Sequence, residues 1–206
     1  MSLGVGGFVA LVPVKPPAIG KSRLDGVGDR AGLARAIAID TISAARDASA
    51  VAEVLVLTDA SFGEELRGLG VSVCADPGGG LNAALRAGAR RAAEQWPGLR
   101  PVALLADLPA LTPAVLDSAL SSVAGAAAYC CDAEGTGTTL YTAAYDDFDP
   151  HFGIGSAAAH RDTGAVPIDG GLAGLRRDVD DAQSLAAARV LGLGPATTAL
   201  LDSVRT

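Results

Sequence analysis

The sequence predicts an α/β fold with a mostly parallel central sheet flanked by helices. One observation leads to this prediction, and a second predicts the number of domains. Short apolar runs of strand length alternate with segments of helical periodicity through the first two thirds of the chain, and this alternation indicates right-handed β-α-β units. The 206 residues contain no linker and no internal repeat, so a single domain over residues 1–206 is expected.

The first two thirds supply the parallel part of the sheet. Residues 8–14 form a continuous apolar run, as expected for a strand covered on both faces. Residues 30–48 repeat apolar or small side chains at helical spacing, which predicts the first helix. The other expected elements of this part are strands at 54–57, 71–75 and 102–106, and helices at 62–69, 81–96 and 113–123.

The pattern changes in the last third of the chain. Apolar runs at 126–131 and 138–143, joined by a polar turn that contains glycine, predict a small antiparallel element. Residues 146–174 are rich in Gly, Asp and His, and a long irregular segment in a compact domain is usually a binding loop or lid. A helix at 181–191 is expected to close the fold.

Composition and charge favour a small-molecule partner. The formal net charge is −7 and no run of Lys or Arg occurs, which argues against nucleic acid or an anionic membrane as the main partner. No apolar run reaches the roughly 18 residues of a membrane helix, and no basic segment precedes the first apolar run, so we expect a cytoplasmic protein. The sequence leaves the oligomeric state open and is compatible with a homo-oligomer.

Two common site signatures are absent from the sequence. The cysteines Cys74, Cys130 and Cys131 have neither C-x-x-C spacing nor a nearby histidine, so buried, reduced thiols are expected instead of zinc ligands. No G-x-G-x-x-G motif follows an expected strand, which weakens the hypothesis of a dinucleotide-binding oxidoreductase.

A basic loop follows the first expected strand. The loop carries Lys15, Lys21 and Arg23 within the segment KPPAIGKSRL, at the sheet edge where open α/β sheets bind ligands. Cations there attract a nucleoside triphosphate and offset charge on the leaving pyrophosphate. Gly20-Lys21-Ser22 does not complete a Walker-type loop, because Lys15 replaces its first glycine and two prolines remove backbone N–H groups. An exposed basic loop without a ligand is the alternative interpretation.

Three aspartates form a candidate metal site. Asp107 ends an expected strand, and Asp178 and Asp180 point the same way if their segment is extended. Carboxylates placed together repel unless a cation lies between them, and Mg²⁺ prefers such oxygen ligands. The alternatives are helix caps. Asp107 is a cap of the following helix unless Thr112 takes that role, and Asp180 or Asp181 is a cap of the last helix.

Glycine-bearing segments supply further candidates. The segment DPGGGLN leads from the third strand into a helix, where Gly80 permits close backbone approach and Asn82 is a candidate ligand of a base or ribose. A plain turn is the alternative. The segments GTGTT and FGIGS offer hydroxyl and backbone N–H groups to a phosphate or carboxylate, with His160 and Arg161 close behind as sources of positive charge.

Taken in order, these segments resemble the guanylyltransferase family of coenzyme F-420 biosynthesis, whose members act on phosphoenolpyruvate or 2-phospho-L-lactate. The resemblance covers nearly the whole chain, and the order and spacing of the motifs are more specific than any one of them. The matching motifs are VPVKPPAIGKSRL, ADPGGGLNAAL, LLADLPAL, GTGTTL, FGIGSAAAHRDTGA, LRRDVDD and LGLGPAT.

The resemblance implies a Rossmann-like nucleotidyltransferase fold, GTP as donor and Mg²⁺ as cofactor. The implied residues are Asp107, Asp178 and Asp180 for the metal, Thr138, Gly153 and Ser156 for the acceptor, and Lys15 and Lys21 for the triphosphate. Lys21 is the better match of the two lysines, because the family keeps K-[ST]-R-L there, and Lys21 and Asp107 are the expected catalytic residues. Ala106 precedes Asp107, where related sugar nucleotidyltransferases carry glycine.

The expected reaction transfers GMP from GTP to phosphoenolpyruvate or 2-phospho-L-lactate and releases pyrophosphate. The sequence does not choose among these acceptors and 3-phosphoglycerate, because they differ by atoms that one loop residue can discriminate. Two alternatives stay open. One is another small-molecule nucleotidyltransferase, of the sugar-phosphate or molybdopterin type, and the other is a non-catalytic nucleotide-binding homologue.

Overall fold

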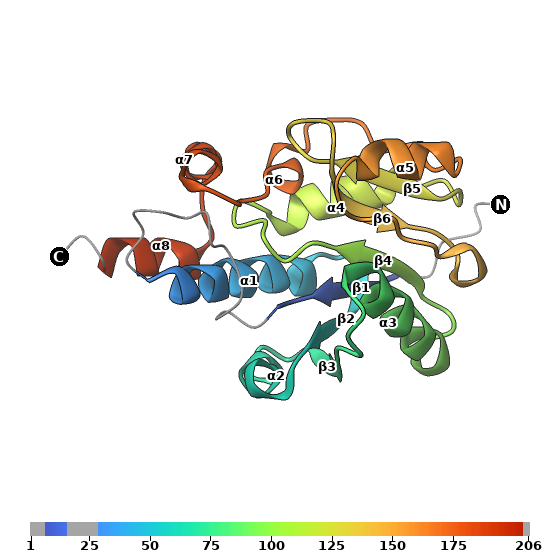
Figure 1. Cartoon of the computed structure of the whole chain (residues 1–206), viewed down its shortest axis with the longest axis horizontal. Helices are drawn as coiled ribbons and strands as arrows, with labels where there is room; N and C mark the ends of the chain where they lie inside the picture. The colour runs from blue at the N-terminus through green and yellow to red at the C-terminus, as the bar shows by residue number, and fades with distance from the viewer. Residues whose placement is uncertain (1–6, 16–28, 204–206) are drawn as a thin grey trace.

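The computed structural model describes residues 7–15 and 29–203, and in these ranges strands alternate with helices (Figure 1). The strands are β1 (Phe8–Pro13), β2 (Val51–Thr58), β3 (Ser72–Ala75), β4 (Arg100–Leu104), β5 (Ala128–Cys131), β6 (Thr138–Thr142) and β7 (Val166–Pro167). The helices are α1 (Arg30–Asp47), α2 (Ala60–Arg67), α3 (Leu81–Gln95), α4 (Pro113–Ser121), α5 (Ser156–Asp162), α6 (Ala173–Arg176), α7 (Ala182–Leu191) and α8 (Pro195–Ser203), with a 3₁₀ turn η2 (Tyr145–Asp147).

All of these strands belong to one sheet, in the order β3-β2-β1-β4-β6-β5-β7. β1 pairs in parallel with β2 and β4, and β2 pairs in parallel with β3. β6 is antiparallel to both β4 and β5, whereas β7 is parallel to β5. The predicted α/β class, with a mostly parallel sheet and a small antiparallel element, is confirmed. Because β1 to β4 end at one edge of the sheet, the loops that follow them meet there.

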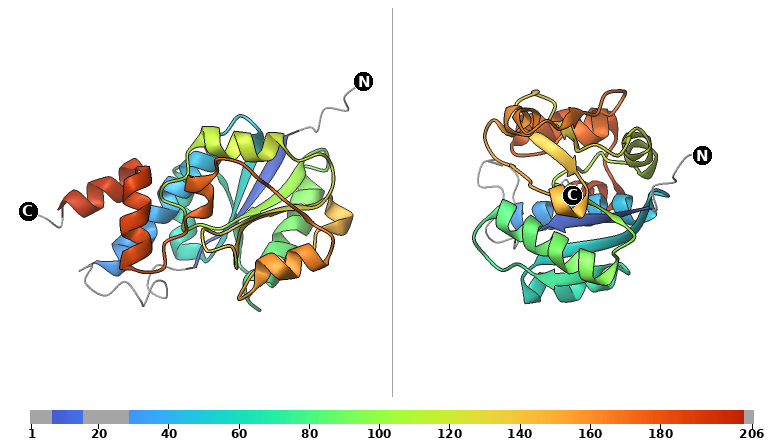
Figure 2. Two further views of the ribbon diagram at one scale, coloured as in Figure 1. Left: turned by 90° about the horizontal axis from the view of Figure 1, so that it is seen from above. Right: turned by 90° about the vertical axis from the view of Figure 1, so that its right-hand side faces the viewer.

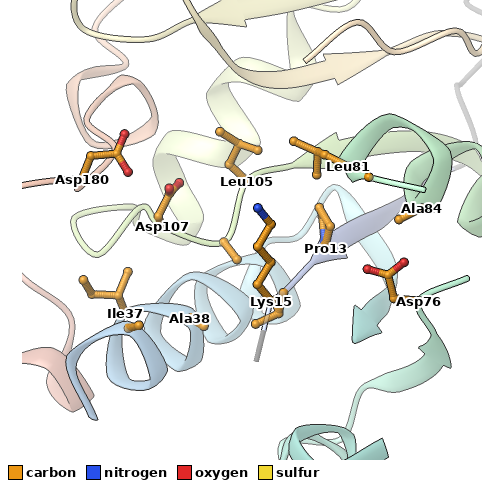
Figure 3. A pocket seen from close by; sticks show the side chains of 14 residues that line it. Pro13, Lys15, Ile37, Ala38, Asp76, Leu81, Ala84, Leu105, Asp107 and Asp180 are labelled. Carbon is orange, nitrogen blue, oxygen red and sulfur yellow. The ribbon is translucent and has the colours of Figure 1, made fainter. Parts of the chain in front are cut away.

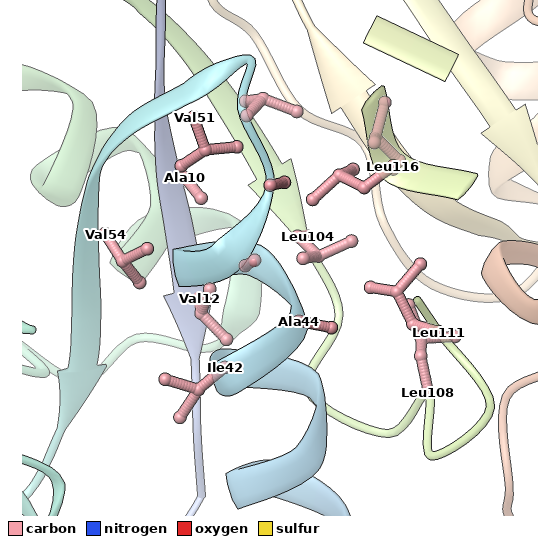
Figure 4. Close-up of a cluster of buried hydrophobic side chains, with 14 of the residues drawn as sticks. Ala10, Val12, Ile42, Ala44, Val51, Val54, Leu104, Leu108, Leu111 and Leu116 are labelled. Carbon is pink, nitrogen blue, oxygen red and sulfur yellow. The ribbon is translucent and has the colours of Figure 1, made fainter. Parts of the chain in front are cut away.

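Helices cover both faces of the sheet, and β1 shows how the sequence produces this. Successive side chains of a strand point to opposite faces. Val12 packs in one cluster with Ile42 of α1 (Figure 4), whereas Leu11 packs in the other cluster with Leu85 of α3. Both strand residues are fully buried. The continuous apolar run predicted for this strand is therefore explained by two apolar neighbours, one on each face.

Helix α8 lies beside α1 near the C-terminus (Figures 1 and 2), and no helix was predicted there from the sequence. The carboxylate of the buried residue Asp40 in α1 accepts hydrogen bonds from the backbone N–H groups of Ala196 (2.9 Å) and Thr197 (2.8 Å). Gly194 permits this approach, because a Cβ atom there would overlap the Asp40 side chain. The capping residue is 156 positions away from Ala196, so the local sequence carries no sign of it.

The segment 146–174 is more regular than expected. It contains α5, β7 and the first residues of α6, so the prediction of an irregular segment is wrong for these parts and holds for the residues between them. Strand β7 has only two residues and exists because Val166 and Pro167 pair with β5. Helix α5 has seven residues and is anchored by the hydrogen bond from Ala157 N–H to the Thr136 carbonyl (3.1 Å). Elements this short do not produce a readable hydrophobic period.

No helix in the described ranges combines the length and the apolar character needed to cross a bilayer. The three cysteines are free thiols. Cys130 is buried, as expected, whereas Cys74 and Cys131 are only half-buried.

Candidate active site

A pocket of ≈ 370 Å³ opens at the carboxyl ends of the parallel strands (Figure 3). Its walls come from the ends of β1 and β4, the loop between β3 and α3, one side of α1 and the segment before α7. Among the described residues the lining is Pro13, Val14, Lys15, Ala34, Ile37, Ala38, Asp76, Gly80, Leu81, Ala84, Leu105, Ala106, Asp107 and Asp180. One ammonium and three carboxylate groups thus face a mostly apolar cavity, as in many small-molecule sites.

Lys15 enters the pocket from the end of β1. Hydrogen bonding of β1 to β2 continues to Val14, whose N–H donates to the Leu57 carbonyl (2.8 Å), and Lys15 is the next residue. Its ammonium group points into the pocket in Figure 3. The other cations predicted to bind the nucleotide, Lys21 and Arg23, lie outside the described residues.

Asp107 and Asp180 turn their carboxylates to the same side of the pocket (Figure 3). Asp107 lies just beyond β4, and one of its carboxylate oxygens is buried. Asp180 is exposed and lies two positions before α7. The N–H of Val179 donates to the backbone carbonyl of Asp107 (3.0 Å), and this bond holds the two chain segments together.

The helix caps are made by other residues. The Thr112 hydroxyl accepts a hydrogen bond from the N–H of Val115 (3.3 Å) and caps α4, as the sequence allowed. Asp181 caps α7 by accepting from the N–H of Ser184 (2.8 Å), and the Ser184 hydroxyl completes a capping box. Neither Asp107 nor Asp180 is therefore needed as a cap.

A close contact between α6 and the loop after Asp107 positions Asp180. Gly174 of α6 lies against the backbone of Ala110, and a Cβ atom at position 174 would overlap the Ala110 carbonyl. Only glycine permits this approach, because the overlapping group belongs to the backbone and cannot turn aside. The segment that leaves α6 thereby reaches Asp107 at the distance needed for the bond from Val179.

Asp178 is not among the lining residues that the structure describes, but its charge interacts with two of the three carboxylates that are, those of Asp107 and Asp180. The pKa of Asp178 is raised to about 7, first by burial and then by the negative charges of Asp107 and Asp180. We call Asp107, Asp178 and Asp180 the aspartate cluster. The fold holds these three like charges near one another, and such an arrangement is favoured when a proton or a cation is present.

The aspartate cluster fits a hard divalent cation that binds together with a substrate. Among the residues that the structure describes, no three His, Cys, Asp or Glu side chains form a ready-made metal site. Mg²⁺ usually takes one or two carboxylates and completes its shell with water and substrate phosphates. Asp107 and Asp180, facing a pocket that Lys15 also faces, offer such a partial set of oxygen ligands.

The predicted acceptor residues meet where the β5–β6 hairpin contacts α5. Thr138 and Ser156 are buried, whereas Gly153 is exposed and has a φ angle of 133°. The Thr138 hydroxyl lies 3.0 Å from Nδ1 of His160, one helical turn after Ser156 in α5. The hairpin turn itself is held by Asp132, whose carboxylate accepts from two backbone N–H groups. The structure thus brings Thr138 and Ser156 to the same helix–hairpin contact.

The two residues predicted from the DPGGGLN segment have different surroundings. Gly80 lines the pocket with a φ angle of 93°, a conformation that favours glycine. Asn82 is not among the lining residues that the structure describes. Its amide donates to the Phe152 carbonyl (2.9 Å) and accepts from the Phe152 N–H (2.8 Å). Asn82 therefore connects α3 to the loop that carries Gly153.

The structure corrects one expectation about charge and adds one residue. His160 was expected to supply positive charge, but it is fully buried and its pKa is lowered to about 4, mainly by burial. It is therefore neutral at neutral pH. Asp76 also lines the pocket at the end of β3, and it was not among the site residues predicted from the sequence. The signal was available, because an acidic residue directly after a strand had also singled out Asp107.

No family model matches the sequence, but curated relatives match almost all of it. A phosphoenolpyruvate guanylyltransferase of Streptomyces coelicolor is 46% identical over 201 residues, covering 94% of this chain and 95% of the relative. The relative of the same name in Thermomonospora curvata is 47% identical over 198 residues, covering 92% and 86%. The one in Rhodococcus opacus is 40% identical over 215 residues, covering 94% and 90%.

Solved structures show the same fold at low sequence identity. A protein from Desulfovibrio desulfuricans described as a nucleotide-diphospho-sugar transferase is 19% identical, with a TM-score of 0.70 and coverage of 95% of this chain and 94% of that one. A nucleotidyl transferase from Methanothermobacter thermautotroptrophicus is 18% identical, with a TM-score of 0.57 and coverage of 90% and 97%. A Mycobacterium tuberculosis protein in complex with manganese is 19% identical, with a TM-score of 0.56 and coverage of 89% and 98%.

These neighbours share the fold, and the relatives share the sequence over nearly its full length. The motifs of the pocket and of the acceptor region are distributed along the matched part of the chain. Identities of 46%, 47% and 40% over more than nine tenths of the sequence identify the chain as a nucleotidyltransferase that belongs to the phosphoenolpyruvate guanylyltransferase family.

Proposed function

We propose that this protein transfers GMP from GTP to phosphoenolpyruvate, with release of pyrophosphate, in the biosynthesis of coenzyme F-420. The structural observation that supports this proposal is the pocket at the strand ends, where Lys15 faces the same cavity as Asp107 and Asp180. A triphosphate needs both cationic side chains and a metal ion to offset its charge. The names of the relatives supply the donor and the acceptor.

GTP occupies the pocket with its phosphates toward Lys15 and the two carboxylates that face it. Gly80, with its left-handed backbone, lets the ligand approach the start of α3 closely. Lys21 and Arg23 are proposed from the sequence as further triphosphate ligands, with Lys21 nearest to the charge that develops on the leaving pyrophosphate. Asp76 lies on the same wall as Gly80 and belongs to the nucleotide side of the pocket.

Asp107 and Asp180 are the proposed Mg²⁺ ligands, and Asp178 completes the charge of the aspartate cluster. The oxygen-only donor set suits Mg²⁺ and also Mn²⁺. When bound, the metal ion neutralises negative charge on the phosphates. The carboxylates themselves fix where a cation lies relative to Lys15, because backbone contacts from Val179 and Gly174 hold their two segments together.

Phosphoenolpyruvate lies at the helix–hairpin contact, against Thr138, Gly153 and Ser156. Two hydroxyl groups and the exposed backbone of a glycine offer neutral hydrogen-bond donors to its phosphate and carboxylate groups. Specificity among three-carbon phosphorylated acids then depends on how these donors match the acceptor's two anionic groups.

The reaction requires positioning more than acid–base chemistry. An ionised acceptor phosphate is already nucleophilic, so it attacks the α-phosphorus of GTP without a side-chain base. A P–O bond forms between the acceptor phosphate and the α-phosphorus, and the bond between the α-phosphorus and the bridging oxygen to the β-phosphate breaks. The protein holds two anions in line and offsets their charge.

The test is an assay with GTP, Mg²⁺ and one acceptor at a time. Pyrophosphate release and product mass are measured with phosphoenolpyruvate, 2-phospho-L-lactate, 3-phosphoglycerate and a sugar 1-phosphate, beside a reaction without acceptor. We expect a product with the mass of GTP plus phosphoenolpyruvate minus pyrophosphate, and the highest kcat/KM for that acceptor. Release with none of the three acids rejects the proposed function, and a product from the sugar phosphate alone assigns a different acceptor class.

A further inference from the structure

His160 of α5 is a buried histidine whose ring has a fixed orientation. Its side chain is fully buried and stacks on Tyr141, with ring centroids 4.5 Å apart and an interplanar angle of 18°. The ring of Phe152 meets it edge-on at 5.5 Å. The imidazole is therefore held between aromatic neighbours, and the direction of its two nitrogen atoms is set by packing.

Both ring nitrogens have a hydrogen-bonding partner, and one partner determines the tautomer. The backbone N–H of His151 lies 2.9 Å from Nε2, and a backbone N–H can only donate. Nε2 is therefore the unprotonated acceptor, and a neutral ring must carry its proton on Nδ1. Nδ1 lies 3.0 Å from the Thr138 hydroxyl oxygen, so it donates to that oxygen.

This direction decides what the Thr138 hydroxyl can do. A hydroxyl group has one proton to donate, and an oxygen that already accepts from Nδ1 keeps that proton for another partner. We propose that His160 is a positioning residue of the acceptor site, which holds the Thr138 hydroxyl as a hydrogen-bond donor toward an anionic oxygen of the acceptor. This inference rests on the proposed function, in which Thr138 binds the acceptor.

The same ring bonds to one part of the proposed acceptor site and lies close along the chain to the other two. Besides its bond to Thr138, it accepts from His151, two positions before Gly153. Ser156 lies four positions earlier in α5, so it shares a face of that helix with His160. Substitutions at this ring therefore act on the acceptor side and leave the pocket of Lys15 and the aspartate cluster in place.

The environment of His160 keeps the imidazole neutral. The pKa of His160 is lowered to about 4, mainly by burial and also by the charge of His151. A backbone hydrogen bond of Ser156 and the charge of Asp149 oppose this shift with smaller effects. A neutral ring cannot attract an anion by charge. Its contribution is the direction of one hydrogen bond, and this distinguishes it from Lys15.

The tautomer can be read without any enzyme assay. The chain has only two histidines, so the ¹⁵N imidazole spectrum of the full-length protein is simple, and the spectrum of His160→Gln identifies the signals of His160. We expect a neutral ring with the proton on Nδ1 throughout pH 6–8. A signal typical of a proton on Nε2, or of a doubly protonated ring, overturns the proposal.

Two isosteric variants separate the roles of the two nitrogens. In His160→Asn the amide NH₂ takes the place of Nδ1 and still donates to Thr138, whereas in His160→Gln the amide takes the place of Nε2 and leaves Thr138 without its donor. We expect KM for phosphoenolpyruvate to rise about tenfold in His160→Gln and less than about threefold in His160→Asn. KM for GTP stays within about twofold in both variants, because the nucleotide pocket is unchanged.

A double variant tests the dependence on Thr138 directly. Thr138→Val removes the hydroxyl, so Thr138→Val with His160→Gln should raise the acceptor KM no further than Thr138→Val alone. Equal effects of His160→Asn and His160→Gln, or additive effects in the double variant, overturn the proposal.

The failure of this inference can be distinguished from the failure of the proposed function. If the wild type is active and His160→Gln leaves the acceptor KM unchanged, only this inference is rejected. If the wild type is inactive with every acceptor, the proposed function is rejected. If the variants do not fold, the spectrum of the wild type still decides the tautomer.

Discussion

The two sides of the proposed site differ in how they treat charge. The aspartate cluster gathers three carboxylates at a pocket and raises the pKa of Asp178 to about 7 by burial and mutual repulsion. The acceptor side, formed by Thr138, Ser156 and His160, is buried, and the pKa of its histidine is lowered to about 4, so it is neutral at pH 7. On one side carboxylates repel one another, and on the other side neutral groups are connected by hydrogen bonds of defined direction.

Because of this difference, the two sides should respond to different changes in conditions and sequence. Carboxylates held together by backbone contacts are sensitive to charge, protons and divalent cations. A histidine locked between two hydrogen-bond partners is sensitive to the loss of a donor or acceptor, and it becomes unfavourable only when the pH is low enough to protonate it.

The largest effect is expected from Asp107→Asn. This variant keeps the size of the side chain and removes one ligand charge, so kcat/KM should fall on the order of 10³-fold. The melting temperature without metal should stay the same or rise, because one of the repelling charges is gone. The control is Asp202→Asn, which removes an exposed carboxylate of α8 and should leave turnover unchanged. An active Asp107→Asn enzyme would refute the metal assignment.

The next effect concerns the contact that assembles the aspartate cluster. In Gly174→Ala the added Cβ collides with the Ala110 backbone, so α6 must shift and carry the segment of Val179 and Asp180 away from Asp107. We expect a loss of about 1–3 kcal/mol in the free energy of unfolding and a fall in kcat of roughly 100-fold. Urea unfolding and steady-state kinetics measure the two effects. The matched control is Gly171→Ala, because a Cβ there meets open space and its backbone is not left-handed. Wild-type kinetics in Gly174→Ala would show that the contact does not position the carboxylates.

The two sides should also have opposite pH dependence of stability. The pKa of His160 is about 4 when folded and about 6.5 when unfolded, so its contribution is present above pH 6.5 and is lost as the pH falls toward 4. The loss is on the order of 3 kcal/mol. The contribution of Asp178 to stability changes with pH in the opposite direction. Its pKa of about 7 in the folded protein lies above the unfolded value, so this carboxyl group destabilises the metal-free protein as the pH rises from 4 to 7.

Variants separate these opposing slopes. Thermal or urea unfolding at several pH values measures both effects. In His160→Gln the free energy of unfolding should no longer fall between pH 6.5 and pH 4 because of this histidine. In Asp178→Asn it should no longer fall between pH 4 and pH 7 because of this carboxylate. Mg²⁺ should stabilise the wild type more at pH 8 than at pH 5, since the cation binds ionised carboxylates. Identical pH profiles of the wild type and His160→Gln would contradict the neutral, buried state of the histidine.

The sequence predicted those features whose cause is local. The apolar run of β1, the position of Asp107 beyond a strand and the Thr112 cap are each written within a few consecutive residues, and the structure contains all three. The spacing of Asp178 and Asp180 also carried real information. Val179 between them is fully buried, so the chain does alternate there, although Asp180 faces the pocket and Asp178 is half-buried.

The features that the sequence did not predict depend on distant partners. Helix α8 begins where Asp40, in another helix, accepts its first N–H groups. The neutral state of His160 is set mainly by burial, and its tautomer is set by a backbone N–H from a neighbouring loop. A histidine beside an arginine in the sequence suggested positive charge, because burial and hydrogen-bond direction cannot be read from adjacent residues. Tertiary contacts decided both cases.

The smallest effect is expected from Thr112→Ala, a variant that tests whether Asp107 and Thr112 have separate roles. Thr112→Ala removes the hydroxyl that accepts from the Val115 N–H, so the free energy of unfolding should fall by about 1 kcal/mol. Thr112→Ser keeps that hydroxyl and should retain most of the stability, as urea unfolding of the two variants can measure. Turnover and Mg²⁺ dependence should match the wild type in both, because the threonine makes no contact with the pocket that the structure describes. Asp107→Asn should show the opposite pattern, with activity lost and stability kept. If Thr112→Ala instead lost activity as Asp107→Asn does, the cap and the metal ligand would have to be treated as one coupled unit.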